Sequence, residues 1–249
     1  MNSENQEEKT MISRRQWDQL YTGVNPHTAP EKDQLRKWLE EHAPRSSGSC
    51  LEIGCFPGRY LSVMGRLGYR LYGVDLAEKL PELEEWLSRE NFNTGTFWQE
   101  DFFSFDPGMA FDMVLSLGFI EHFQNWDEVL EKHFPLVKKG GHIILEAPNF
   151  THGVQSWIHR TLDRENYLQH FPEAMDIESW RKVLERGGFE VIFCGYAGRF
   201  DFWVQAQERG ILSRSALTIL RYLKPAAALL PAGNKLYSPY AVVMARKRA

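Results

Sequence analysis

A short apolar strand, a glycine turn and the start of a helix follow one another in Leu51-Glu52-Ile53-Gly54-Cys55-Phe56-Pro57-Gly58-Arg59-Tyr60. This order is typical of the nucleotide-binding corner of a doubly wound α/β sheet. Two details separate it from a dinucleotide fingerprint. An acid, Glu52, stands two residues before the first glycine, and Arg59 interrupts the G-x-G-x-x-G spacing. The stretch therefore predicts a nucleoside-binding loop of a different kind.

Two more predicted strands carry an acid at their end. Residues 70–75 close on Asp75, and residues 96–102 carry Asp101. A carboxylate after the second strand can accept hydrogen bonds from both ribose hydroxyls of a nucleoside. Strand-like runs also occupy 111–117, 138–146, 189–196 and 240–246. Because strands and helices alternate, we expect a mostly parallel sheet with right-handed crossovers.

The acids at three successive strand ends, in register with the glycines, carry a family resemblance. Glu-x-Gly-x-x-x-Gly resembles the first motif of the class I S-adenosylmethionine-dependent methyltransferases, small-molecule branch, and the resemblance covers about residues 48–150. It implies a doubly wound, seven-stranded Rossmann-like α/β sheet with an antiparallel last strand, N-terminal helices and helical lid insertions. It also implies S-adenosylmethionine as the cofactor and S-adenosylhomocysteine as the product. The cofactor-binding positions that it implies are Trp17, Tyr21, Glu52, Gly54, Cys55, Phe56, Gly58, Asp75, Leu76, Asp101, Phe102, Ser116 and Leu117.

The chain departs from the family motif at Phe56, where the middle glycine would stand, and Pro57 follows it. Glycine normally lets the backbone approach a ligand closely, and proline removes a donor. The ring either packs under the following helix or covers the cofactor. A third interpretation is a degenerate member with damaged binding, which the retention of Asp75 and Asp101 argues against.

The composition limits which substrates, cell compartments and membrane associations are expected. The 249 residues carry a formal net charge of −4, which argues against a nucleic-acid substrate. The small-molecule acceptor is what the family resemblance implies. Three cysteines without metal spacing and the absence of a signal peptide indicate a reduced, cytoplasmic protein. The most apolar long stretch, 211–231, is interrupted by charges and prolines, so no membrane span is expected.

We expect a disordered start at 1–12 and a single methyltransferase domain at 13–249. Insertions at about 150–175 and 203–231 are predicted to form a lid or acceptor region. The second insertion suits an acceptor pocket, a homodimer contact or a membrane-surface contact, with packing on its own core as the default.

Three helices are predicted around the sheet, at 13–22, at 31–42 and from Asn125 to Lys139. The first carries Trp17 and Tyr21, which either close over the cofactor, as the resemblance implies, or pack as hydrophobic residues. Pro135 predicts a break in the third helix, and Gly140 is its expected C-cap.

The chemistry is expected just after the fourth strand. Leu117-Gly118-Phe119-Ile120-Glu121-His122 stands where the methylases of amide or base amino groups have Asn/Asp-Pro-Pro-aromatic, which argues against DNA-base and glutamine methylation. Some small-molecule O-methyltransferases have Glu-x-x-Glu-His here and bind a divalent metal. Gly118 replaces the first of those glutamates, so we predict no required metal.

His122 is the candidate general base, because an unperturbed imidazole titrates near neutral pH. In the alternative interpretation, Glu121 and His122 anchor the following helix. We expect His152, His159 and His170 to have polar surface roles, and His42 and His133 to be solvated on helices.

The pattern as a whole predicts methyl transfer from S-adenosylmethionine to a hydroxyl oxygen of a small molecule. Two alternatives stay open: a nicotinamide-dependent oxidoreductase on a similar sheet, and a non-catalytic S-adenosylmethionine-binding protein.

Overall fold

The computed structural model describes residues 10, 16–17, 19, 21–204, 211–227 and 229–249. Its centre is a seven-stranded sheet in the order β3-β2-β1-β4-β5-β7-β6. The strands are β1 (Ser49–Ile53), β2 (Arg70–Asp75), β3 (Thr94–Gln99), β4 (Phe111–Leu117), β5 (Val137–Pro148), β6 (Phe189–Ala197) and β7 (Tyr240–Lys247). Strands β1 to β5 pair in parallel, and β7 is antiparallel to both β5 and β6. This arrangement confirms the predicted fold and its antiparallel last strand.

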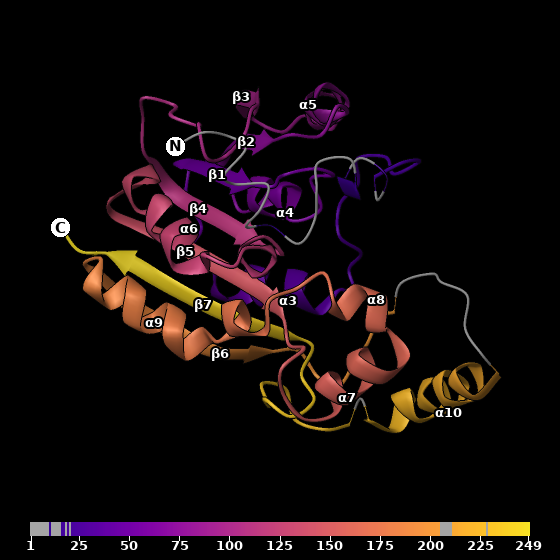
Figure 1. Ribbon diagram of the computed structural model, residues 1–249. Helices are drawn as coiled ribbons and strands as arrows, with labels where there is room; N and C mark the ends of the chain where they lie inside the picture. Colours follow the sequence, from indigo (N-terminus) through magenta and orange to yellow (C-terminus); the bar gives the residue numbers. More distant parts are fainter. Residues whose placement is uncertain (1–9, 11–15, 18, 20, 205–210, 228) are drawn as a thin grey trace.

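Helices cover both faces of the sheet (Figure 1). One core layer holds apolar residues of α3 (Gln34–His42), α4 (Leu61–Arg66) and α5 (Leu80–Arg89). The opposite layer holds those of α6 (Trp126–Lys132) and α9 (Ile177–Arg186). Other helical elements in the described part of the chain are α7 (Gly153–Leu162), α8 (Arg164–Tyr167), α10 (Ile211–Ala227) and the short 3-10 turns η1 (Ile120–His122), η2 (Phe134–Leu136) and η3 (Pro172–Met175).

Helix α9 shows why these segments fold locally. Asp176 caps its first turn by accepting a hydrogen bond from the Glu178 N–H at 3.2 Å. Its buried side chains recur at helical spacing and face the sheet: Ile177, Trp180, Val183 and Leu184. Gly187 follows the last turn as the C-cap. The helix is therefore specified by its own cap and by one apolar face.

The predicted helix from Asn125 to Lys139 is too long. Helix α6 ends at Lys132, and Pro135, which has no N–H to continue a helix, lies in η2. Strand β5 already begins at Val137. Gly140, expected as a C-cap, lies inside β5 with φ +76°, next to the irregularity in the pairing of β4 with β5. The glycine thus accommodates a bulge rather than a helix end.

Strands β1 to β5 end at one edge of the sheet, here called the carboxyl edge. Helices α7, α8 and α10 lie beyond this edge (Figure 1). Leu217 of α10 packs with Ile158 and Leu162 of α7 and with two phenylalanines that follow β6, in a small separate cluster. Within the described residues, no helix combines the length and apolarity needed to cross a membrane. The expected disorder at 1–12 falls outside the described residues except for Thr10, which forms an isolated antiparallel bridge with Phe123.

Candidate functional site

The loop after β1 turns on two glycines with left-handed backbone. Gly54 has φ +68° and Gly58 has φ +84°, conformations that L side chains rarely adopt. The Gly54 N–H donates to the Val74 carbonyl at 2.9 Å, which ties the loop to β2. A side chain at Gly58 would collide with Leu83, and a Cβ at Gly54 would lie 3.3 Å from Phe119. Both predicted glycine positions are therefore required by the turn itself.

Asp75 holds this loop in place. One carboxylate oxygen accepts from the Phe56 N–H at 2.8 Å, and the other accepts from the Ala77 N–H at 2.8 Å. These two bonds fix the Asp75 carboxylate at the end of β2, beside the glycine loop. Leu76 beside it is half-buried. The Phe56 side chain is 2% exposed and belongs to the core layer that includes α4. This position agrees with the interpretation that the ring packs under the following helix.

Asp101 and Phe102 follow β3, which ends earlier than expected, at Gln99. Asp101 accepts from the Phe103 N–H at 2.9 Å. The Phe102 ring is buried and lies against His133, with ring centroids 4.7 Å apart. Its packing is therefore mainly with the core.

The prediction that His133 is solvated is wrong. Its side chain is fully buried, and its Nδ1 lies 2.7 Å from the Val129 carbonyl, one helical turn back. Burial lowers the pKa of His133 to about 4, although that carbonyl contact favours the protonated form. The ring serves as a core residue.

Three buried glutamates, Glu52, Glu121 and Glu146, gather at the carboxyl edge. Burial raises the pKa of all three, to about 8 for Glu121 and well above the usual range for the other two. Glu52 and Glu121 each have a buried Oε2 that meets no hydrogen-bond donor in the described part of the chain. Leaving buried carboxyl oxygens unpaired is costly, so the edge is suited to a ligand that brings positive charge or donors.

Strand β4 delivers two further predicted residues to this edge. Ser116 is fully buried, and its hydroxyl has no partner among the residues that the structure describes. Leu117, the last residue of the strand, is half-buried against the α4 layer. Cys55, in the glycine loop, is buried as a free thiol, and burial raises its pKa further from neutrality.

Aromatic contacts link the glycine loop to His122. The rings of Phe56 and Tyr21 lie 5.1 Å apart, those of Tyr21 and Trp17 lie 5.9 Å apart, and those of Trp17 and His122 lie 5.0 Å apart. The structure thus places Trp17 and Tyr21 between the loop and η1. This position is compatible with closure over a cofactor and with packing alone.

His122 lies inside the protein. Its Nδ1 is 2.8 Å from the Gln169 carbonyl, and burial lowers its pKa to about 4. The expectation of surface roles for His159 and His170 is wrong, because both are buried; His152 is half-buried. Aromatic stacking explains part of this burial, since the His159 ring lies 3.7 Å from that of Phe150.

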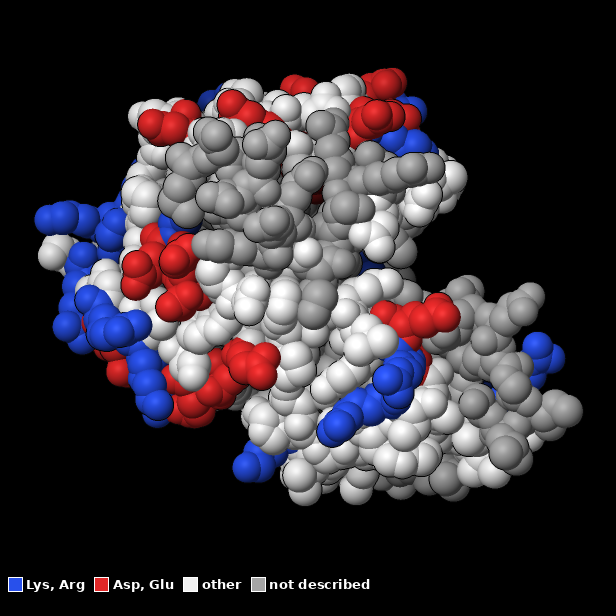
Figure 2. Space-filling view, in the orientation of Figure 1, with Lys and Arg blue, Asp and Glu red and all other residues white. Residues whose placement is uncertain are grey.

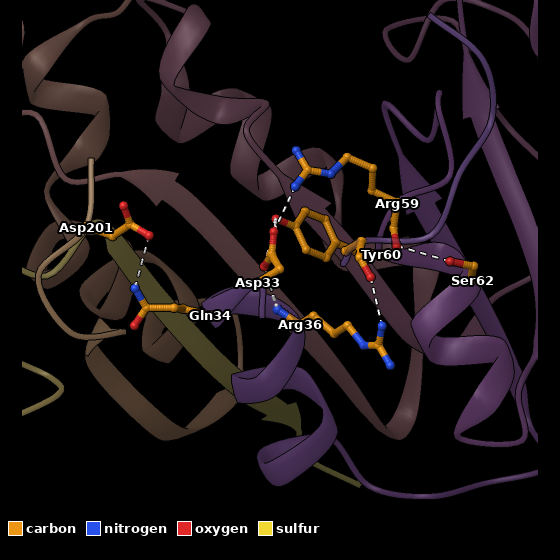
Figure 3. Close-up of polar contacts among 8 residues, drawn as sticks. Asp33, Gln34, Arg36, Arg59, Tyr60, Ser62 and Asp201 are labelled. Carbon is orange, nitrogen blue, oxygen red and sulfur yellow. Dashed lines mark hydrogen bonds and ion pairs between the residues drawn. The ribbon is translucent and has the colours of Figure 1, made fainter. Parts of the chain in front are cut away.

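A polar network that the sequence did not predict connects the start of α3 to the residues that follow the glycine loop (Figure 3). Asp33 caps α3 by accepting from the Arg36 N–H at 3.0 Å and forms an ion pair with Arg59 at 2.7 Å. The Tyr60 hydroxyl approaches the same carboxylate at 3.3 Å. Only the N-cap role had a local signal, an acid just before a helix. The Arg59 partner comes from a distant segment.

Known methyltransferases resemble this chain in sequence. Residues 27–192 match the family described as "Methyltransferase domain". A ubiquinone biosynthesis O-methyltransferase of Thiobacillus denitrificans is 26% identical over 169 residues, covering 66% of this chain and 69% of that protein. For a homologue of the same name from Paraburkholderia phymatum, the identity is also 26%, over 61% of this chain and 66% of that protein.

Solved structures share the fold. A structure described as a putative methyltransferase from Bacillus halodurans superposes with a TM-score of 0.58 at 18% identity, covering 86% of this chain and 99% of that one. The magnesium protoporphyrin IX methyltransferase of Synechocystis with bound S-adenosylhomocysteine has a TM-score of 0.52 at 15% identity, covering 95% and 88% of the two chains.

Proposed function

Since this chain belongs to the methyltransferase domain family, we propose that it transfers the methyl group of S-adenosylmethionine to a hydroxyl oxygen of a small molecule. The observation that carries the proposal is the group of acids at the carboxyl edge, beside the glycine loop. Ligands of doubly wound sheets bind outside this edge. The cytoplasmic location and the homodimer stay predictions of the sequence.

The charge of the edge favours this cofactor over a dinucleotide. S-adenosylmethionine carries a sulfonium and an ammonium group, whereas NAD carries a negatively charged pyrophosphate. Glu52 and Asp75 lie close enough for their charges to raise each other's cost of ionisation. The nearby cation Arg59 is already paired with Asp33. An incoming positive charge would stabilise these acids, and a pyrophosphate would be repelled by them.

The aromatic rings beyond the loop support an acceptor with a flat, apolar body. Trp203 is partly exposed, and its ring stacks on that of Tyr240 with centroids 5.5 Å apart. Rings of this kind bind apolar and aromatic surfaces. The names of the relatives, O-methyltransferases, support oxygen as the acceptor atom.

The reaction is a direct displacement. The acceptor oxygen attacks the methyl carbon, the carbon–sulfur bond breaks, and its electron pair stays on sulfur to give S-adenosylhomocysteine. Alignment of oxygen, carbon and sulfur supplies most of the acceleration. We assign His122 the transfer of the hydroxyl proton and Glu121 its support. The lowered pKa keeps the imidazole neutral and able to accept a proton, although it makes the ring a weak base.

Calorimetry and mass spectrometry test the proposal. S-adenosylmethionine and S-adenosylhomocysteine should bind, and NAD and NADP should not. Incubation with S-adenosylmethionine and a panel of hydroxylated aromatic compounds, alongside matched amines, should give a mass gain of one methylene on the hydroxylated compounds only. Tight NAD binding would contradict the cofactor. Cofactor binding with no methylated product from the panel or from a metabolite extract would identify a non-catalytic binding protein.

A further inference from the structure

Two histidines and a glutamate meet at the carboxyl edge, next to the glycine loop. Glu121 and His122 belong to η1, and His170 lies in the turn between α8 and η3. One ligand-capable atom of each residue lies within 4.8 Å of the other two, and all three side chains are buried. The sequence analysis predicted no required metal because Gly118 replaces a family glutamate. His170 comes from outside that local motif, in the turn after α8.

Backbone contacts hold the two segments together. The Phe171 N–H donates to the Glu121 carbonyl at 2.8 Å. One residue before His170, the Gln169 carbonyl accepts from the His122 ring at 2.8 Å. The contacts flank His170 on both sides, so its ring is fixed against η1. The rings of His122 and His170 lie 4.6 Å apart.

Both imidazoles are oriented as metal ligands are. The Nδ1 atoms of His122 and His170 lie 2.8 Å and 2.7 Å from the carbonyls of Gln169 and Asn166. A carbonyl only accepts, so Nδ1 carries the proton and Nε2 keeps its lone pair. Metal-binding histidines usually donate their other ring N–H in this way. Both rings are also buried, which disfavours the charged imidazolium, and only the neutral imidazole binds a metal.

A second set of contacts supports His170. The carbonyl that fixes its ring belongs to Asn166, whose side-chain amide donates to Asp163 at 2.8 Å. Asp163 also pairs with the buried His159 at 3.1 Å. Groups behind the ligands commonly set their orientation in metal sites. Here they fix the third donor, the one that comes from outside the motif.

Glu121 provides the negative charge. Its Oε2 is buried and receives no hydrogen bond within the described ranges. A bound cation would satisfy this oxygen and would favour its ionised form. With metal–ligand bonds of about 2.1 Å, donor atoms in a tetrahedral site lie about 3.4 Å apart, so metal binding would draw the three side chains closer together.

From this arrangement we infer that Glu121, His122 and His170 bind a divalent transition-metal cation. Two imidazole nitrogens and one carboxylate suit Zn²⁺, Fe²⁺ or Mn²⁺ and are poorly matched to Mg²⁺ and Ca²⁺, which prefer oxygen ligands. Three protein ligands leave the remaining coordination positions to water or to an oxygen of a bound molecule. The inference leaves the proposed methyl transfer unchanged but replaces proton transfer as the role of His122, because a metal-bound Nε2 cannot also accept the hydroxyl proton. The cation can be measured without cofactor or acceptor.

The test uses the full chain after treatment with a chelator and dialysis. Titration with Co²⁺, followed by visible absorption, and with Zn²⁺, followed by calorimetry, should show one equivalent bound, and Mg²⁺ should bind far more weakly. His170→Ala and Glu121→Gln should each lower Zn²⁺ affinity by roughly 100-fold or more. His152→Ala is the matched control: this half-buried histidine belongs to the same region, and its Nδ1 bonds the Thr151 hydroxyl at 2.8 Å. It should bind Zn²⁺ like the unchanged protein.

Two results would overturn the inference. One is the absence of stoichiometric Zn²⁺ or Co²⁺ binding by the unchanged protein. The other is equal Zn²⁺ affinity in the unchanged protein and in Glu121→Gln. The glutamine keeps the size and shape of the side chain, so this variant carries the test if His170→Ala does not fold. Failure of metal binding with normal methyl transfer would remove the cation alone and leave the proposed function standing.

Discussion

At the amino edge of the sheet, Asp112 is satisfied by its own chain: one oxygen accepts from the Ser49 N–H, the Ser49 hydroxyl and the Lys138 ammonium, all within 2.9 Å. These donors lower the pKa of Asp112. At the carboxyl edge of the same sheet, Glu52 and Glu121 are buried with an oxygen that has no described partner, and their pKa values are raised. The comparison separates an acid that is paired within the fold from two buried acids that, under the proposals above, a ligand would pair.

Surface charge alone does not reveal this difference. Figure 2 shows acidic and basic side chains interspersed over the visible face rather than gathered in a field of one sign. The contrast lies in buried groups. Variants at matched positions on the two edges can therefore test this contrast between the buried acids.

The largest effect is expected for the histidines. His122→Ala should lower turnover roughly 10²-fold with cofactor affinity nearly intact, because the acceptor side loses its proton acceptor or its metal ligand. His142→Ala, on β5 at the amino edge, is the control and should turn over normally. Steady-state kinetics with calorimetry of S-adenosylmethionine binding measures both.

Chelation separates the two roles of His122, since a metal-bound Nε2 cannot also take the acceptor's proton. If stripping the metal lowers wild-type turnover to the level of His122→Ala, the residue acts as a ligand. If turnover survives stripping but not the substitution, it acts as a base. Normal turnover in a stable His122→Ala protein would remove it from the reaction.

Cofactor affinity should show the next largest effect. Asp75→Ala removes charge-assisted bonds to the ribose and to the loop, so we expect binding weaker by more than about 1 kcal/mol. Asp112→Asn, half-buried like Asp75 but at the amino edge, should bind S-adenosylmethionine normally. Equal affinities in calorimetry would show that the two edges do not differ in this way.

Glu52 at the carboxyl edge and Asp112 at the amino edge should change the folding stability in opposite directions as pH rises. The folded pKa of Glu52 is raised, so the ligand-free protein loses stability as pH rises from about 4.3, where the unfolded carboxyl ionises. Glu52→Gln should therefore gain melting temperature relative to wild type as pH rises, by roughly 2–4 °C for each kcal/mol relieved. The folded pKa of Asp112 is lowered, so its contribution is present above about pH 3.9 and is lost as pH falls through the folded value.

Asp112→Asn should accordingly melt lower than wild type at neutral pH, with the difference closing in acid. Thermal melts between pH 3 and pH 8 without ligands compare the two variants. Curves that shift in the same direction for both would contradict the contrast drawn from burial and pairing.

The smallest expected effect is in backbone dynamics. Cofactor and acceptor together should slow hydrogen exchange in residues 150–175, which lie at the carboxyl edge, because closure excludes water from the reaction. Residues 134–142, at the amino edge, provide the internal reference and should exchange at an unchanged rate. Unchanged exchange in both segments under saturating ligands would make 150–175 an ordinary part of the scaffold.

Much of the fold could be predicted because its signals are local. Strands β2 and β4 lie at 70–75 and 111–117, as apolar runs bounded by turns indicated. The break expected at Pro135 is present, but continuation of the helix to Lys139 was wrong, because apolar periodicity alone does not distinguish a helix from the 3-10 turn that contains Pro135 and the strand after it.

The candidate site likewise has some residues with a local sequence signal and others without one. Glu52, Asp75 and Asp101 could be placed at the carboxyl edge because each lies within two residues of a strand end, and the glycines because the turn needs them. The pairing of Arg59 with Asp33 and the approach of His170 to His122 join segments far apart in the chain, so no spacing rule reports them. The burial of His133, His159 and His170 was missed because histidine is intermediate in hydrophobicity and occurs both inside and outside.

The antiparallel strand β7 has a consequence for how this protein can evolve. Ala197, at the end of β6, pairs with Tyr240, at the start of β7, so the connection between them departs from the carboxyl edge and returns to it. Loops tolerate insertion and sequence change far better than sheet interiors do. Natural variation in the length or composition of that connection, which contains α10, can thus remodel the carboxyl edge, where the proposed acceptor would bind, while the register of the sheet is inherited unchanged.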